Sequence, residues 1–342
     1  MSMTIHERPG VYSSYDASAV ISGSGGGQTV GLAAVRSEGE SGGLLVLNRY
    51  EDAAAQFGAE ENLTKLAQAL FRNGAARVVT APVSGQEGYQ AAFDLLAAEE
   101  DIDLVVCDST ELTVQQALRQ SVCQASGARR ERIAVVSGAK AETVEDLTKR
   151  AQGLNSERVV LIAPGDGNGL TAAAAAGAIA AERDPAVPLG GAELRGLDGL
   201  EARYADSEID TLVRGGVTPL ENVGGVVSVI RGVTTRTKTG EAEDITWREL
   251  TTIRIVDDVI PTIRNALRTR FRRTKNTEQT RGAIRSQVVM ELENKLARSI
   301  ITGYDQVSVR ADEENPTVCL VDFAFTVAHG LNQIWLSAHI TV

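Results

Sequence analysis

The central part of the chain alternates short apolar runs with segments whose apolar residues recur at helical spacing. The runs LLVL, RVVTAPV, DLVV, RIAVV and RVVLIA are nearly continuous in aliphatic residues, which is typical of strands buried on both faces of a parallel sheet. Helical spacing is seen between them in three sets of residues: Leu63, Leu66 and Leu70; Tyr89, Phe93 and Leu96; Val144, Leu147 and Leu154. With the Ala-rich segment GLTAAAAAGAIAAERD after the last run, residues 29–183 are predicted to form an α/β domain with a mostly parallel sheet.

After about residue 190 the pattern changes to short strand fragments rich in Gly and Thr, such as GGVVSVIRGVTTRTKTG. A helix is expected to begin near Asp257, because Asp257 and Asp258 would be favourable in its first turn. Its apolar face would carry Ile263, Leu267 and Phe271. A second helix is predicted from four-residue spacing over the set Ile284, Val288, Leu292, Leu296 and Ile300. These helices indicate an α+β C-terminal domain.

The end of the chain shows strand alternation. One face of a predicted strand carries Cys319, Val321, Phe323, Phe325 and Val327. After HGLNQ, the run IWLSAHITV alternates to the last residue, with one face formed by Ile334, Leu336, Ala338, Ile340 and Val342. A terminal strand frays unless something pairs with it. Its partner is either an internal hairpin through AHGLN or a sheet edge of another subunit, which is strand donation.

The beginning of the chain poses the same question. An extended ERPGVY segment, with Pro9, Gly10, Val11 and Tyr12, is followed by SGSGGG and then by the apolar run TVGLAAV. The glycines at 23, 25, 26 and 27 form either a phosphate cradle or a hinge between an arm and the first strand. A dinucleotide fingerprint needs strand, turn and then helix, whereas these glycines precede a strand. The backbone freedom of Gly23, Gly25, Gly26 and Gly27 therefore favours a hinge.

The composition and charge of the chain argue against several classes of protein. The 342 residues carry a net charge of −11, which argues against general nucleic-acid binding, because that needs clustered cations. No apolar run is long enough to span a bilayer, and the N-terminus has no secretory pattern. The cysteines, Cys107, Cys123 and Cys319, are odd in number and widely separated. They are expected to be buried free thiols in a reducing cytoplasm.

The sequence gives little support for a catalytic function. The chain has no P-loop, and His6, His329 and His339 lie near its two ends, outside the predicted α/β domain. No carboxylate pair stands out as an acid/base couple. The turn APGDGNG follows a strand and precedes a helix, so it is either an anion site or a tight turn capped by Asn168 or Thr171. No enzymatic activity, cofactor or metal is expected.

A basic patch lies between residues 264 and 285. Its members are Arg264, Arg268, Arg270, Arg272, Arg273, Lys275, Arg281 and Arg285, against the single acid Glu278. Eight minus one gives +7, which leaves −18 for the rest of the chain. Arg264, Arg268 and Arg272 form a stripe at four-residue spacing. The patch is either a solvated helix face with local ion pairs or a contact surface for an acidic partner, with nucleic acid as a weaker option.

The order of several motifs resembles the tail sheath family of contractile phage tails and related injection systems. ERPGVY resembles the N-terminal arm of that family, and TVGLAAVRSEGE its first strand and loop. YEDAAAQFGAEENLTKLAQALFRNGAARVVTAPV resembles its aromatic-Gly pair, helix and Asn-Gly before a strand. IITGYDQVSVRADEENPTVCLVDFAFTVAHGLNQIWLSAHITV resembles its C-terminal strand, acidic loop and arm. The chain is short for the family, which suggests a sheath without large decorating insertions.

The resemblance implies a structural subunit. Hexameric rings would stack helically around an inner tube, and the sheath would contract to drive that tube through a target envelope. The arms would add strands to neighbouring subunits, through Pro9, Gly10, Val11, Tyr12, Ile334, Leu336, Ile340 and Val342. The stripe of Arg264, Arg268 and Arg272 would face the inner tube by complementary charge.

The expected organisation is an arm with a hinge over 1–27, an α/β domain over 28–195, an α+β sheath domain over 196–329 and a strand arm over 330–342. Further partners would be baseplate and tail-terminator proteins. Neither nucleic acid nor membrane contact by this chain is expected, and assembly would occur in the bacterial cytoplasm, as part of a phage tail or tail-like particle. The alternatives are an α/β enzyme with an anion site at residues 165–169, or another self-assembling tube or capsid component.

Overall fold

The structure, a computed structural model, describes residues 28–37, 43–332 and 334–337. Its strands are β1 Thr29–Val35, β2 Leu45–Leu47, β3 Arg77–Val83, β4 Leu104–Cys107, β5 Ile133–Ser137, β6 Val159–Ala163, β7 Glu193–Leu194, β8 Thr218–Val223, β9 Val226–Val229, β10 Lys238–Thr239, β11 Ala242–Glu243, β12 Ile301–Ala311 and β13 Cys319–Val327. Its α-helices are α1 Tyr50–Phe57, α2 Asn62–Arg72, α3 Tyr89–Ala98, α4 Leu112–Gly127, α5 Val144–Leu154, α6 Leu170–Ala181, α7 Asp206–Arg214, α8 Leu250–Arg270 and α9 Glu278–Ala297.

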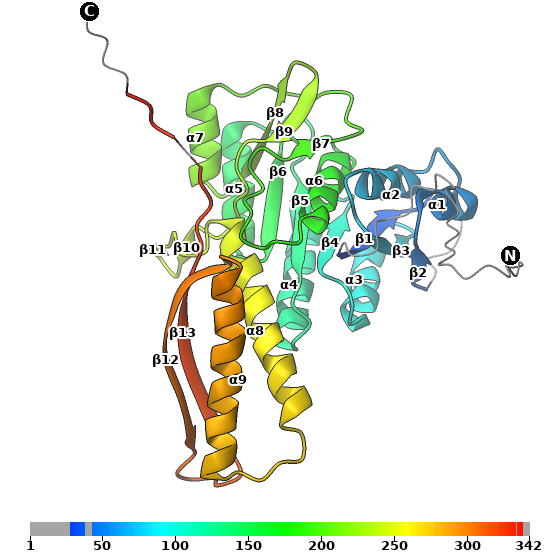
Figure 1. Cartoon of the computed structure of the whole chain (residues 1–342). Helices are drawn as coiled ribbons and strands as arrows, with labels where there is room; N and C mark the ends of the chain where they lie inside the picture. The colour runs from blue at the N-terminus through cyan, green and yellow to red at the C-terminus, as the bar shows by residue number, and fades with distance from the viewer. Residues whose placement is uncertain (1–27, 38–42, 333, 338–342) are drawn as a thin grey trace, which may run out of the picture.

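The large sheet has the strand order β2-β3-β1-β4-β5-β6-β8-β9-β7 (Figure 1). Its centre is parallel, from β3 through β1, β4, β5 and β6 to β8, whereas β2 at one edge and the β8-β9-β7 group at the other pair antiparallel. The expected mostly parallel sheet is therefore confirmed, and the strands and helices predicted between residues 44 and 181 are all present. The sheet also continues beyond residue 195, because β8 and β9 belong to it.

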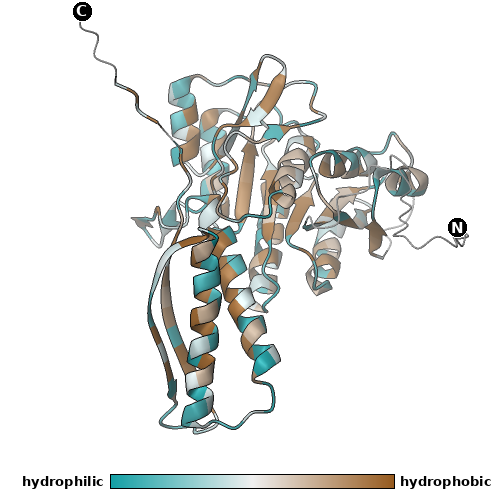
Figure 2. Ribbon diagram, in the orientation of Figure 1, coloured by the Kyte–Doolittle hydropathy of each residue, from teal (hydrophilic) through white to brown (hydrophobic). Residues whose placement is uncertain are grey.

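Helices cover both faces of this sheet. One face packs against α1, α2 and α6, and the other packs against α3, α4, α5 and α7. The buried strands are brown along most of their length, whereas the helices alternate brown and teal (Figure 2). Small residues let α6 lie close to α2: a Cβ at Gly177 would come within 2.7 Å of the backbone oxygen of Leu70. The Ala-rich sequence of α6 is thus required by this close approach of two helices.

A second unit projects from one end of the sheet and consists of α8, α9 and the β12-β13 hairpin (Figure 1). Its core contains Val259 and Ile263 from α8 together with Val288 and Leu292 from α9. The predicted strand face is confirmed, since the set Val321, Phe323, Phe325 and Val327 packs against this core. In β13, Asp322, Ala324 and Thr326 are exposed on the opposite face.

The expected start of the first C-terminal helix was wrong. Helix α8 begins at Leu250, seven residues before Asp257, so Asp257 and Asp258 lie in its middle rather than in its first turn. The extra turns are stabilised by tertiary packing, because Leu250 and Ile253 are buried against the core of the large sheet. Helix α8 therefore joins two hydrophobic cores, since its residues from Ile255 onward pack in the second unit.

Candidate functional site

The turn that the sequence offered as an anion site is already occupied by a side chain of the protein. The carboxylate of Asp166 accepts hydrogen bonds from the N–H groups of Asn168 at 3.2 Å, Gly169 at 2.8 Å and Thr171. Gly169 is the N-cap of α6, with φ +82°, and no side chain caps it directly. The expectation of Asn168 as cap is confirmed in part, because its side chain accepts a hydrogen bond from the N–H of Leu170 at 3.3 Å, while Asp166 accepts from Gly169 and Thr171. An external anion would meet a carboxylate here.

The crevice between β1 and β4, where an α/β sheet commonly binds ligands, is bridged in the same way. Asp108 at the end of β4 accepts hydrogen bonds from the N–H of Val35 at 3.0 Å, from Nδ2 of Asn62 at 3.3 Å and from the hydroxyl of Tyr89. Burial and the neighbouring Asp108 carboxylate raise the pKa of Tyr89. These contacts tie loops together and leave the tyrosine neutral, which suits a structural role better than acid/base chemistry.

The three thiols are free but differ in exposure. Cys107 is buried, and burial raises its pKa to about 12. Cys319 is half-buried, whereas Cys123 is exposed on α4, so the expectation that all three are buried was wrong for Cys123. In the part of the chain that the structure describes, no group of three or more His, Cys, Asp or Glu is placed to hold a metal. None of the described helices is long and apolar enough to cross a membrane.

The β12-β13 hairpin forms a sheet of two strands among the described residues, so each strand pairs on one side. Its inner face covers α8 and α9, and each strand leaves a row of backbone N–H and C=O groups on its outer edge. Such edges are templates for a further strand. The sheet therefore has the geometry of an acceptor for strands from outside the hairpin.

The described residues after β13 do not fold back to form an internal hairpin. Residues 328–332 and 334–337 are in no strand, and the chain leads away from the hairpin (Figure 1). Ile334 is 79% exposed and Leu336 is 92% exposed. Of the predicted arm residues, Ile340 and Val342 lie outside the described residues, as do Pro9, Gly10, Val11 and Tyr12, and the hinge set Gly23, Gly25, Gly26 and Gly27.

The basic patch divides into bound and unbound side chains. Arg264 donates to Glu131 of the α4-β5 turn at 2.7 Å, so the stripe expected from the sequence loses its first member to a contact within the chain. Arg268 is exposed near the end of α8, and Arg272 follows the helix, because α8 ends at Arg270. Arg272 and Arg273 are exposed in the turn between α8 and α9.

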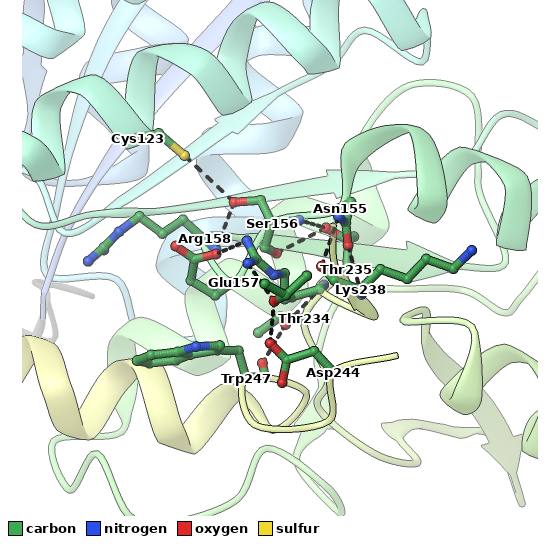
Figure 3. A network of polar contacts seen from close by, with 12 residues as sticks. Cys123, Asn155, Ser156, Glu157, Arg158, Thr234, Thr235, Lys238, Asp244 and Trp247 are labelled. Carbon is green, nitrogen blue, oxygen red and sulfur yellow. Dashed lines mark hydrogen bonds and ion pairs between the residues drawn. The ribbon is translucent and has the colours of Figure 1, made fainter. Parts of the chain in front are cut away.

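A polar joint holds residues 230–249, which connect β9 to α8, against the start of β6 (Figure 3). The side chain of Asn155 accepts hydrogen bonds from the N–H groups of Thr237 at 3.1 Å and Lys238 at 3.2 Å. The hydroxyl of Thr235 accepts from the N–H of Ser156 at 3.1 Å and donates to the Ser156 carbonyl at 3.0 Å. The backbone of this connection is thus satisfied by neighbouring loops in place of a strand ladder.

Ion pairs extend the joint to α8. Arg158 binds Asp257 through two hydrogen bonds, at 2.8 and 2.9 Å, with 13% and 16% of the two side chains exposed. Lys295 of α9 binds Asp258 at 2.6 Å. The acidic pair that suggested a helix start in the sequence therefore serves two long-range contacts. Sequence reasoning could not find these partners, because they lie 99 and 37 residues away.

Comparisons with known proteins identify similar sequences and folds. Residues 83–235 match the family model of the phage tail sheath protein central domain, and residues 242–341 match that of the phage tail sheath C-terminal domain. A tail sheath protein of Bacillus phage SP01 is 28% identical over 261 residues, which are 72% of this chain and 44% of that protein. The chain thus spans less than half of the length of this curated relative.

Solved structures share the fold over nearly the whole chain. A chain of the anti-feeding prophage baseplate superposes with a TM-score of 0.76 at 16% identity, covering 99% of this chain and 100% of that one. A chain of the contracted helical sheath of the same prophage gives 0.72 at 16% identity, with 98% and 99% covered. A sheath tail protein from Listeria innocua gives 0.71 at 12% identity, with 90% and 93% covered.

The two family models follow one another in chain order and leave a gap of only a few residues, at the β10-β11 turn. The central-domain match contains the sheet unit from β4 to β9, whereas β1, β2, α1 and α2 precede it, and the unit of α8, α9, β12 and β13 lies within the C-terminal match. Both models describe structural components of tails rather than catalysts. The chain therefore belongs to the phage tail sheath protein family.

Proposed function

We propose that the chain is the sheath subunit of a contractile phage tail or tail-like particle. Copies would form hexameric rings that stack helically around an inner tube, and contraction would drive the tube through a target envelope. Likeness of fold to chains of the anti-feeding prophage helical sheath and baseplate supports this proposal. Baseplate and tail-terminator proteins would be partners at the two ends, and assembly would occur in the bacterial cytoplasm.

The proposal depends most on one observation: a two-stranded sheet with open edges is followed by an alternating segment that lies in no strand of its own chain. Donation of the 330–342 arm to the β12-β13 sheet of a neighbour would pair the open edge of that sheet and would give the arm a strand partner. Burying Ile334 and Leu336, which are 79% and 92% exposed, would contribute about 1.5–3 kcal/mol each. New ladder hydrogen bonds would offset part of the cost of ordering the arm.

The N-terminal arm and its glycines would act together with this strand. In the proposed organisation, residues 1–27 form an arm and hinge and 330–342 the second arm, and the α/β domain extends past the expected boundary at residue 195 to include β8 and β9. Flexible linkage would keep the arms paired while the bodies rotate. The extended sheath would then be kinetically trapped, and contraction would release free energy through better contacts between bodies.

The inner-tube contact is proposed on the exposed part of the basic patch. Arg268 and Arg272 keep this role, whereas reversing the charge of Arg264 would also break its bond to Glu131. Exposed cations attract an acidic surface weakly and in a salt-dependent way, so they would release during contraction. The test is Arg268→Glu with Arg272→Glu, co-expressed with the tube protein. Sheath-only tubes should persist and tube-filled extended particles should be lost; normal tube-filled particles from this variant would remove the patch from the mechanism.

The assembly proposal is tested by electron microscopy and sedimentation of the purified chain. The intact chain should form rings or hollow helical tubes, and deletion of residues 334–342 should leave a folded body that does not assemble. Ile334→Asp with Leu336→Asp should act like the deletion, because both side chains belong to one face of the arm. Ser337→Asp on the opposite face is the matched control and should assemble. An intact chain that stays monomeric at high concentration would contradict the proposed function.

A further inference from the structure

A cavity of about 530 Å³ opens between the large sheet and the middle of α8. Its lining includes Thr29, Leu104 and Ile133, which begin β1, β4 and β5, and Asp257 and Pro261 of α8. The cavity therefore lies at the amino edge of the sheet, opposite the edge where α/β folds usually bind ligands. Its size falls within the range of about 300–1,000 Å³ in which protein pockets hold ligands. We call it the α8 cleft.

Cations in the α8 cleft are short of partners. It is lined by Arg129, Arg130, Arg183 and Arg254, and none of them forms an ion pair with a carboxylate among the described residues. Arg254 is only 8% exposed, and its guanidinium donates to the backbone carbonyl of Glu182 at 2.6 Å. Burial lowers the pKa of Arg254. A buried guanidinium that donates to a neutral carbonyl gains from any carboxylate that enters the cleft.

Half of the carboxylates in the lining are already paired with other cations. Glu131, Asp257 and Asp258 line the cleft but are bound by cations outside it, namely Arg264, Arg158 and Lys295. Glu100, Asp101 and Asp103 remain, and burial raises the pKa of Asp103. Four arginines thus face three carboxylates that are not bound by cations outside the cleft, which leaves one positive charge in excess.

The backbone presents one of these cations in an unusual way. Arg129 follows the end of α4 with φ +68°, in the left-handed region where glycine or asparagine is the common choice. Strained residues of this kind concentrate at functional positions. Arg129 is exposed at the rim of the cleft, and Arg183 is exposed there as well.

A complementary group lies elsewhere on the same chain. The loop between β12 and β13 carries Asp312, Glu313 and Glu314, and the last two are exposed, with no ion pair to any described residue. The loop is held in shape, since Asn276 donates to the Pro316 carbonyl at 2.8 Å. It lies at the end of the second unit farthest from the sheet (Figure 1). It cannot reach the α8 cleft of its own chain without unfolding that unit.

We infer that the α8 cleft receives the Glu313-Glu314 loop of a second copy of this chain. Each copy then offers one loop and accepts one, which is a heterologous contact of the kind that builds rings and helices. The inference rests on the proposed self-assembly but names a contact separate from the strand arms. Carboxylates of the loop pair with Arg129 and Arg183 at the rim, and Arg254 lies deeper in the cleft.

Charge reversal tests the contact. The cleft variant is Arg129→Glu with Arg183→Glu, and the loop variant is Glu313→Lys with Glu314→Lys. Each alone should reduce sedimentable tubes at least tenfold. An equal mixture of the two should restore tubes, because the acidic cleft of one variant matches the basic loop of the other. A single chain with all four changes should also assemble.

The control for the cleft variant is Arg214→Glu with Arg298→Glu. It changes the net charge by the same amount as the cleft variant, at exposed positions outside the cleft, and it should assemble as the wild type does. Tubes at wild-type amount from either variant, or no rescue by mixing folded variants, overturns the inference. Absence of tubes from the wild-type chain instead overturns the proposed function.

A cross-link provides a test without charge reversal. Arg129→Cys with Glu313→Cys, in a chain whose exposed Cys123 is changed to Ser, should give covalently linked copies under oxidising conditions. Each single cysteine variant is the control and should give far fewer linked copies. Equal amounts of linked copies from the double variant and the controls overturn the inference, even if the cleft variant fails to fold.

Discussion

Removal of the Asp257 carboxylate should destabilise the chain far more than the loss of an exposed ion pair. In Asp257→Ala the guanidinium of Arg158 loses two charge-assisted hydrogen bonds and keeps only its bond to the Arg132 carbonyl at 3.2 Å. Because only 13% of the Arg158 side chain is exposed, water cannot fully replace the carboxylate. Breaking a largely buried pair on one side costs about 3–5 kcal/mol.

The matched control is Asp210→Ala. Asp210 and Arg214 are 3.9 Å apart on α7, with 72% and 79% of their side chains exposed, so their separation should cost at most about 0.5 kcal/mol. The double variant Arg158→Met with Asp257→Leu removes both charges and should be more stable than Asp257→Ala, because no unpaired charge stays in the joint.

Urea unfolding of unassembled chains, followed by tryptophan fluorescence, measures these differences. Trp247 lies in the connection next to the joint (Figure 3), so it reports on the region that the variants change. With a slope of about 3 kcal/mol per molar urea, Asp257→Ala should lower the midpoint by about 1–1.7 M. A shift as small as that of Asp210→Ala would refute the reasoning, and so would a double variant that is no more stable than Asp257→Ala.

Iodoacetamide should modify Cys123 and spare Cys107 in the native chain, because burial raises the pKa of the Cys107 thiol to about 12; equal labelling in a peptide map would contradict this. Burial also raises the pKa of Asp103 in the folded chain. The stability that this group contributes is fully present below its unfolded pKa of about 3.8, and it is lost as pH rises through the folded pKa. Asp103→Asn should therefore gain stability relative to wild type from pH 4 to 7, and a constant difference in urea midpoint would argue otherwise. Gly165→Ala should lower the free energy of unfolding by about 1–3 kcal/mol, because the added Cβ would lie 1.9 Å from the backbone oxygen of Gly138. Gly282→Ala, in an open position of α9, should instead raise the free energy of unfolding by about 0.5–1 kcal/mol.

Local pattern was sufficient for the elements of the sheet unit. Strands such as Val159–Ala163 are fully buried on both faces, so their sequence has to be continuously apolar and could be recognised without tertiary knowledge. The α5 and α9 helices were equally evident from residues at helical spacing, although α9 ends at Ala297 and Ile300 lies beyond it. The alternation over Cys319–Val327 identified β13 and its buried face correctly, because a strand with one solvated face has to alternate.

The beginning of α8 could not be read in this way. The residues from Leu250 to Ile255 are rich in Thr and Ile, which locally favour a strand. They are helical because Leu250 and Ile253 reach the core of the sheet unit while Ile255 reaches that of the second unit. Packing against two cores overrides weak local propensity.

By itself, the sequence determined most strands and helices of the sheet unit up to α6, though not α1 or α7. It also determined the class of the sheet, the absence of a P-loop and the motif order that indicates a sheath protein. These properties depend on neighbours within a few residues, where spacing and propensity act. Only the tertiary structure decided that Asp166 fills the expected anion site, that Arg264 is bound to Glu131 and that four arginines from separate segments line the α8 cleft. Such contacts join residues far apart in the chain, and the pairing of a charge depends on which partner the fold brings within about 3 Å.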